Sequence, residues 1–127
     1  MEIRRQDDVT TIDELIGFPL DQLLMVGTCI DDGCYCFMRC REQWHRFFID
    51  EGVLFWDTTD PDTNDFLGKD HFVSIPEELG LVNHPMTINK ILMRDDKLTI
   101  ELTNSHSLIF IQDNVTYNIK VCLAESS

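Results

Sequence analysis

The sequence has few basic residues and no long apolar run. Ten Lys and Arg stand against 23 Asp and Glu, which gives a formal net charge of −13 at pH 7. A nucleic-acid binder needs cations to neutralise phosphates, so this balance disfavours nucleic acid as a partner, and it equally disfavours an anionic membrane surface. The longest apolar run, residues 23–27, is too short to cross a bilayer, and residues 1–8 lack the apolar core of a signal peptide. We therefore expect a cytoplasmic protein that binds neither nucleic acid nor membrane.

The sequence also lacks the short motifs that carry catalysis or hold a cofactor. It contains no G-x-S-x-G, no P-loop and no G-x-G-x-x-G. The four histidines share no H-x₃-H spacing, and the sequence identifies no partner that would make one of them a catalytic base. They are His45, His71, His84 and His106. We expect a protein without catalytic residues or a cofactor, and an active site assembled from distant residues stays open as an alternative.

One acidic segment begins like a calcium-binding loop and then departs from the pattern. Residues 60–64 place oxygen ligands at alternate positions, but an EF-hand loop needs Gly at its sixth position and Glu at its twelfth. Asp65 and His71 occupy those two positions. A solvated acidic loop is therefore the favoured interpretation.

Cysteine occurs in an odd number, five, which fits a reducing compartment better than a disulfide framework. Four thiols have the spacing C-x₄-C-x-C-x₃-C, whereas zinc sites usually combine two close pairs that lie well apart. Thiols spread along a strand cannot all converge on one metal ion, and cysteine packs well in a core. The four are Cys29, Cys34, Cys36 and Cys40. Core packing is favoured, and a Cys29–Cys36 redox pair across a hairpin or a metal site are the alternatives.

Short polar turns between apolar segments predict two β-hairpins in the first half of the chain. The first turn contains Asp32-Gly33, and an Asp-Gly pair is a favoured two-residue hairpin loop; residues 50–52 form the second turn. The predicted hairpins join residues 23–30 to 34–41 and residues 47–49 to 53–56.

The last third of the chain predicts an antiparallel meander. Residues 98–102 alternate between apolar and polar, as do residues 115–123, which is typical of half-buried strands. Residues 108–111 are apolar on both faces, as in a central strand, and residues 88–93 add a fourth strand. Cap and stop residues predict short helical segments at 11–17 and 74–80. We predict one domain, 1–127, of α+β class: mostly antiparallel β, with hairpins, a C-terminal four-strand meander and one or two short helices.

The negative charge is distributed unevenly along the chain. Nine acids and one base lie between Asp50 and Glu78, which contributes −8 of the −13. Aromatic residues are interleaved with these acids, and such a mixture suits an interface with a basic protein, since rings supply buried area and carboxylates supply register. The alternative is an ordinary surface loop with its rings turned inward. The predicted partner-binding residues are Trp56, Asp57, Asp60, Asp62, Asp65, Phe66 and Asp70.

These features together resemble the immunity proteins of bacterial toxin–immunity pairs, including those of contact-dependent growth inhibition. The resemblance is one of type and covers the whole chain: its size, its acidity, its short polar turns, and segments such as residues 97–102. It implies a cytosolic inhibitor that covers the active site of a cognate toxin, often a basic nuclease. The alternatives are a general interaction or regulatory module with an unrelated partner and, less favoured, a small enzyme.

Overall fold

The computed structural model describes most of the chain as antiparallel β-structure. Strands take up 66% of the described residues, and one four-residue helix, α1 (Ile75–Glu78), accompanies them. The mostly antiparallel part of the predicted fold is therefore confirmed, with less helix than an α+β fold implies. The described residues are 3–5, 9–11, 14–27, 29–58, 72–81, 86–94, 96–103 and 105–125.

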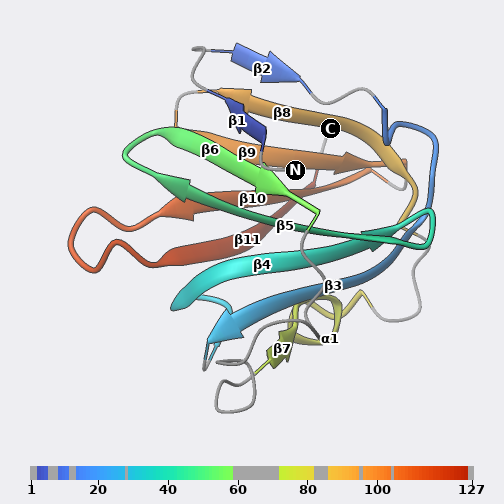
Figure 1. Cartoon of the computed structure of the whole chain (residues 1–127). Helices are drawn as coiled ribbons and strands as arrows, with labels where there is room; N and C mark the ends of the chain where they lie inside the picture. The colour runs from blue at the N-terminus through green and yellow to red at the C-terminus, as the bar shows by residue number, and fades with distance from the viewer. Residues whose placement is uncertain are drawn as a thin grey trace.

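Six strands form a first meander in the order β7-β3-β4-β5-β6-β1 (Figure 1). All neighbouring pairs are antiparallel, and the pairs β3–β4 and β5–β6 are the two hairpins predicted from the sequence. The strands are β1 (Ile3–Arg5), β3 (Leu20–Gly27), β4 (Gly33–Cys40), β5 (Gln43–Asp50), β6 (Val53–Asp57) and β7 (Phe72–Ser74).

Five strands form a second meander in the order β11-β10-β9-β8-β2. The four C-terminal strands confirm the predicted meander, and β2 adds a short strand to its edge. The strands are β2 (Val9–Thr11), β8 (Ile88–Arg94), β9 (Lys97–Leu102), β10 (His106–Gln112) and β11 (Ile119–Glu125).

The two meanders belong to one hydrogen-bonded sheet that curves back on itself (Figure 1). Gly33 of β4 pairs with Ile119 of β11 at one corner, and the residues before β3 pair with the start of β8 at another. The short strands β1 and β2 lie at opposite ends of the strand order, yet Arg5 and Val9 are only four peptide links apart. Those links span at most about 15 Å, so the two ends of the sheet lie close together.

The curved sheet encloses one main hydrophobic core. Phe47 lies at its centre: its ring stacks on Trp56 at 5.0 Å and meets Phe110 of the second meander edge-on at 5.1 Å. A smaller cluster, centred on Val26 and Phe37, occupies the other face of the first meander. Inward-facing positions alternate along the strands, as period-2 geometry requires.

Three sequence predictions differ from the structure in detail. The segment predicted as a short helical turn, 11–17, contains the end of β2 and a hydrogen-bonded turn over residues 14–17, so its described part is not a helix. The first hairpin closes between Gly27 and Gly33, which pair with each other, so its strands end earlier and begin earlier than the predicted residues 30 and 34. The second predicted helix, 74–80, is confirmed only over α1.

The last strand also begins later than predicted. Val115 and Tyr117 alternate with polar residues, but both lie in the six-residue turn before β11, with exposed fractions of 85% and 65%. Alternation predicted them as inward-facing strand residues, and that prediction is wrong. The cause is local: the Asp113 side chain accepts hydrogen bonds from the amides of Val115 (2.7 Å) and Thr116 (3.1 Å). These bonds close a turn, so these residues do not pair with a neighbouring strand.

The turn between β5 and β6 depends on a glycine. Asp50 pairs with Val53, so the loop consists of Glu51 and Gly52, both with positive φ (51° and 79°), as a type I′ turn requires. A Cβ on Gly52 would also lie 2.5 Å from Asp96 Oδ1, an atom of the turn between β8 and β9. Gly52 therefore supports both its own turn and the approach of a neighbouring one.

We expect Gly52→Ala to lower the free energy of unfolding by about 1–2 kcal/mol, through a disfavoured φ and displacement of Asp96. Gly80→Ala is the matched control, because Gly80 also has a positive φ (74°) and has nothing within 4 Å of the added Cβ. Urea denaturation compares the two variants. Equal losses would contradict the role given to Asp96.

Candidate partner-binding surface

The described part of the predicted binding segment is engaged within the protein itself. Trp56 faces the core, is 2% exposed, and donates a hydrogen bond from Nε1 to His45 Nδ1 at 3.0 Å. Since so little of its surface is accessible, the prediction that Trp56 contacts a partner does not fit this position. The other face of β6 carries Asp57, and its Oδ2 accepts from Arg46 Nη2 at 2.5 Å and from Arg46 Nε at 3.2 Å.

This ion pair neutralises the Asp57 carboxylate inside the molecule. Arg46 and Asp57 lie directly opposite each other on β5 and β6, which brings the two side chains together on one face. The remaining predicted residues lie outside the described residues: Asp60, Asp62, Asp65, Phe66 and Asp70.

The cysteine cluster divides between core and surface. Cys36 and Cys40 are buried, which confirms the core packing predicted for them, and burial raises the pKa of both thiols. Cys29 and Cys34 are exposed, so that prediction is wrong for these two. Met25, rather than Cys29, pairs with Cys36, and their sulfur atoms lie 3.7 Å apart. The alternative of a Cys29–Cys36 redox pair is therefore excluded.

No metal centre is found in the part of the chain that the structure describes. Within it, no three His, Cys, Asp or Glu side chains are grouped as metal ligands. The only helix in this part of the chain, α1, is one turn long, which is too short to cross a lipid bilayer.

Four hairpin turns converge at one end of the molecule, on the left side of Figure 1. They connect β3 to β4, β5 to β6, β8 to β9, and β10 to β11. We call the surface that they form the four-turn surface. In antiparallel meanders alternate turns lie at the same end, so residues far apart in the sequence meet here. The charged residues of its described part are Asp31, Asp32, Asp50, Glu51, Asp96, Asp113, Lys97 and Lys120.

Gln112 ties two of these turns together. Its Oε1 accepts from the Glu51 amide at 2.9 Å, and its Nε2 donates to Asp50 Oδ1 at 3.3 Å and to the Tyr117 carbonyl at 3.2 Å. The Asn118 amide group donates to Asp32 Oδ1, which connects the turn between β3 and β4. The relative positions of three turns are therefore fixed by side-chain hydrogen bonds.

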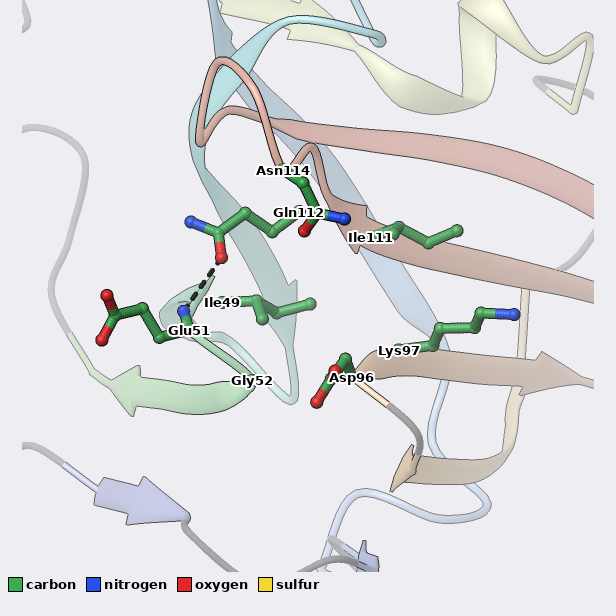
Figure 2. A pocket seen from close by; sticks show the side chains of 8 residues that line it. All are labelled: Ile49, Glu51, Gly52, Asp96, Lys97, Ile111, Gln112 and Asn114. Atoms are coloured by element: carbon green, nitrogen blue, oxygen red, sulfur yellow. Dashed lines mark hydrogen bonds between the residues drawn. The ribbon is translucent and has the colours of Figure 1, made fainter.

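A pocket of about 220 Å³ opens between three of the turns (Figure 2). Ile49 and Ile111 lie at its centre in Figure 2, and the Glu51 side chain extends outward from its own turn. The Asp96 carboxylate lies beside Gly52, at the rim. The pocket is therefore partly apolar, and its charged lining residues are two carboxylates, Glu51 and Asp96, and one ammonium group, Lys97.

Carboxylates outnumber ammonium groups on the described part of this surface by six to two. Five of the six carboxylates belong to exposed residues, and the sixth, Asp113, is half-buried. Hydrogen bonds from the Val115 and Thr116 amides, with help from Lys120, lower the pKa of Asp113, so it stays ionised near neutral pH. At the opposite end, Arg41 shares a pocket with Glu14 and is followed by Glu42, so these three turn residues carry a net charge of −1. The described residues of the four-turn surface carry −4, so more of the negative charge lies at that end.

Exposed apolar groups stand on the same surface. Val115 and Tyr117 have the largest exposed fractions among the large apolar residues of the described chain; the next, Phe72 and Ile16, are 40% and 39% exposed. Sequence reasoning missed both, since alternation alone resembled a strand. The available signal was the run of turn-forming residues at Asp113, Asn114 and Asn118, which brackets them.

Comparisons with protein-family models, with curated proteins and with solved structures give no match. The surface is therefore interpreted from its own geometry and charge.

The hydrogen bond from Trp56 Nε1 favours one neutral tautomer of the His45 ring. An indole nitrogen can only donate, so Nδ1 of His45 must accept, and the neutral ring carries its proton on Nε2. Desolvation by burial lowers the pKa of His45, although the Glu14 carboxylate opposes this effect. Protonation at Nδ1 would bring two donors face to face beside the core.

We expect acidification to destabilise the protein through His45. Its folded-state pKa lies below the unfolded value, so the unfolded chain binds more protons as pH falls through about 6.5, and the stability present above that pH is lost. His45→Asn keeps an acceptor near Trp56 but does not titrate. Urea denaturation at pH 7 and pH 5 should give a larger loss for the wild type than for the variant. Equal losses would assign the pH dependence to other groups.

We expect iodoacetamide to separate the five thiols of the folded protein into two classes. The exposed residues Cys29, Cys34 and Cys122 should be alkylated in the folded protein, because the reagent can reach their sulfur atoms. The buried residues Cys36 and Cys40 should react only in denaturant. Peptide mapping by mass spectrometry identifies the modified sites, and rapid labelling of Cys36 in native protein would contradict its burial.

Proposed function

We propose that the protein is an acidic inhibitor that neutralises a basic toxin domain in the cytoplasm, with the four-turn surface as its binding face. The observation that carries this proposal is the convergence of six carboxylates from four separate turns beside exposed apolar side chains. Clustered carboxylates steer a cationic protein toward one face and align it there. The partner is a protein: the same charge repels nucleic acid and anionic lipid.

The proposed mechanism is steric and electrostatic. A nuclease holds phosphate in a basic groove, and a face rich in carboxylates can occupy that groove in place of substrate. Hydrogen bonds between the turns hold the carboxylates in position before binding, which reduces the ordering cost of the complex. Binding in the groove excludes substrate, and inhibition requires no catalysis by this chain.

This proposal moves the binding face from the segment predicted by the sequence to the hairpin turns. Trp56 and Asp57 supply neither an accessible ring nor a free charge. The four-turn surface offers both, since Tyr117 is 65% exposed beside ionised carboxylates.

Charge reversal tests the proposal. The partner to use is the product of the adjacent gene, expressed as its toxic domain, with binding followed by surface plasmon resonance at several salt concentrations. Asp31→Lys with Glu51→Lys should lower the association rate roughly tenfold or more at low salt and flatten its salt dependence, because steering is lost. The same double variant should no longer protect cells that express the toxin domain.

Glu77→Lys with Glu78→Lys is the matched control, since it changes the net charge equally in α1, outside the four-turn surface. The control should retain binding and protection. If both double variants bind alike, total charge rather than this face governs the encounter, and the assignment of the surface is wrong. If the adjacent product does not bind the wild type, the toxin-inhibitor function is wrong.

A further inference from the structure

The turn between β10 and β11 presents two apolar side chains that contribute little to the fold. Val115 and Tyr117 are 85% and 65% exposed, so truncating either removes little buried area. Tyr117 also has φ +63°, a left-handed conformation that costs energy for a residue other than Gly or Asn. A turn with no role beyond stability would be expected to carry polar residues at these two positions, with Asn favoured at position 117, where φ is positive.

The same turn is fixed by a dense set of hydrogen bonds. Asp113 accepts through its side chain from two amides, its carbonyl accepts from the Tyr117 amide at 2.9 Å, and its own amide donates to the Asn118 carbonyl at 2.8 Å. Gln112 donates to the Tyr117 carbonyl, and Asn118 donates to Asp32. Both exposed side chains therefore stand on a backbone that is ordered before any partner arrives.

We propose that Val115 and Tyr117 are the apolar anchors of the interface, inserting into an apolar pocket that is bordered by Lys or Arg side chains on a partner protein. This inference rests on the proposed function and adds the contact residues and the partner's surface chemistry. Exposed rings on a rigid turn bind with little loss of conformational freedom, and tyrosine is enriched among the residues that dominate binding energy.

Charge complementarity favours a basic protein as the partner that covers these anchors. Asp113 lies on the same turn as the anchors and accepts from the Val115 amide, while Asp32 and Asp50 accept from Asn118 and Gln112 at the ends of that turn. A basic border on the partner would therefore meet carboxylates. A second copy would bring the same carboxylates face to face, and an anionic bilayer would be repelled. Self-association and lipid binding are therefore measured separately.

Tyr117→Asn is the central variant. Asn accepts the left-handed conformation more readily than Tyr, so the variant removes the ring and should be at least as stable as the wild type by urea denaturation. Val115→Ala is the second variant, and Ile16→Ala is the matched control, because Ile16 is a partly exposed apolar residue outside this turn. Any loss of binding by Tyr117→Asn is then separable from loss of folding.

A phage-displayed random dodecapeptide library is the probe, selected on the wild-type protein. Enriched peptides should carry net positive charge together with an apolar residue, bind the Ile16→Ala variant equally well, and bind Tyr117→Asn at least about tenfold more weakly. No enrichment, enrichment without positive charge, or equal binding to Tyr117→Asn would overturn the inference.

Two further measurements test the other occupants. Sedimentation velocity should find the wild type and Tyr117→Asn in the same monomeric state, and vesicles of phosphatidylcholine with phosphatidylserine should bind neither. Self-association or vesicle binding that disappears in Tyr117→Asn would assign the anchors to a second copy or to lipid, and the inference would fail.

The inference and the proposed function fail separately. The library requires no toxin, so its result stands even if the adjacent product does not bind. If that product binds and responds to Asp31→Lys with Glu51→Lys but binds Tyr117→Asn with unchanged affinity, the inhibitor function holds and the anchors are wrong. If Tyr117→Asn binds that product more weakly and with a faster dissociation rate, the result supports the anchor role proposed for Tyr117.

Discussion

The packing of Phe47 between Trp56 and Phe110 holds the two meanders together. Backbone pairing between β4 and β11 consists of one bridge, Gly33 with Ile119, so hydrogen bonds alone link the two halves weakly at this corner. Phe47 meets Phe110 of the second meander edge-on, and its stacking on Trp56 within the first meander holds its ring in place for that contact. All the turns at one end are carried on strands that this core positions, so the four-turn surface is a product of core packing.

The longer strands and their pairing with chain neighbours were predictable from the sequence, but the short strands β1, β2 and β7 and the joining of the two meanders into one sheet were not. Alternation identified residues 98–102, and a continuous apolar run identified residues 108–111; both lie in strands. Alternation also extended the last strand into Val115 and Tyr117, since period 2 does not distinguish a strand from a turn held by Asp113. Which turns share an end depends on topology, and no local pattern contains that information.

The predicted site shows the same limit. Composition indicated correctly that acids and aromatic residues occur together, but the inward or outward direction of a ring depends on its register. Trp56 lies opposite Phe47 and therefore faces the core, whereas Asp57, the next residue, faces Arg46. A shift of one residue in register would have exchanged these environments. The carboxylates that do converge come from four segments, and each carries only one or two of them.

The short strands β1 and β2 have a consequence for the order of folding. They precede the other described strands along the chain, yet β1 pairs with residues 54–56 and β2 with residues 92–94, so each pairs with a strand far along the chain. Closing such long loops costs chain entropy before any contact repays it. We therefore expect β1 and β2 to pair after the hairpins β5–β6 and β8–β9 have formed, because the two-residue hairpin turns close far shorter loops.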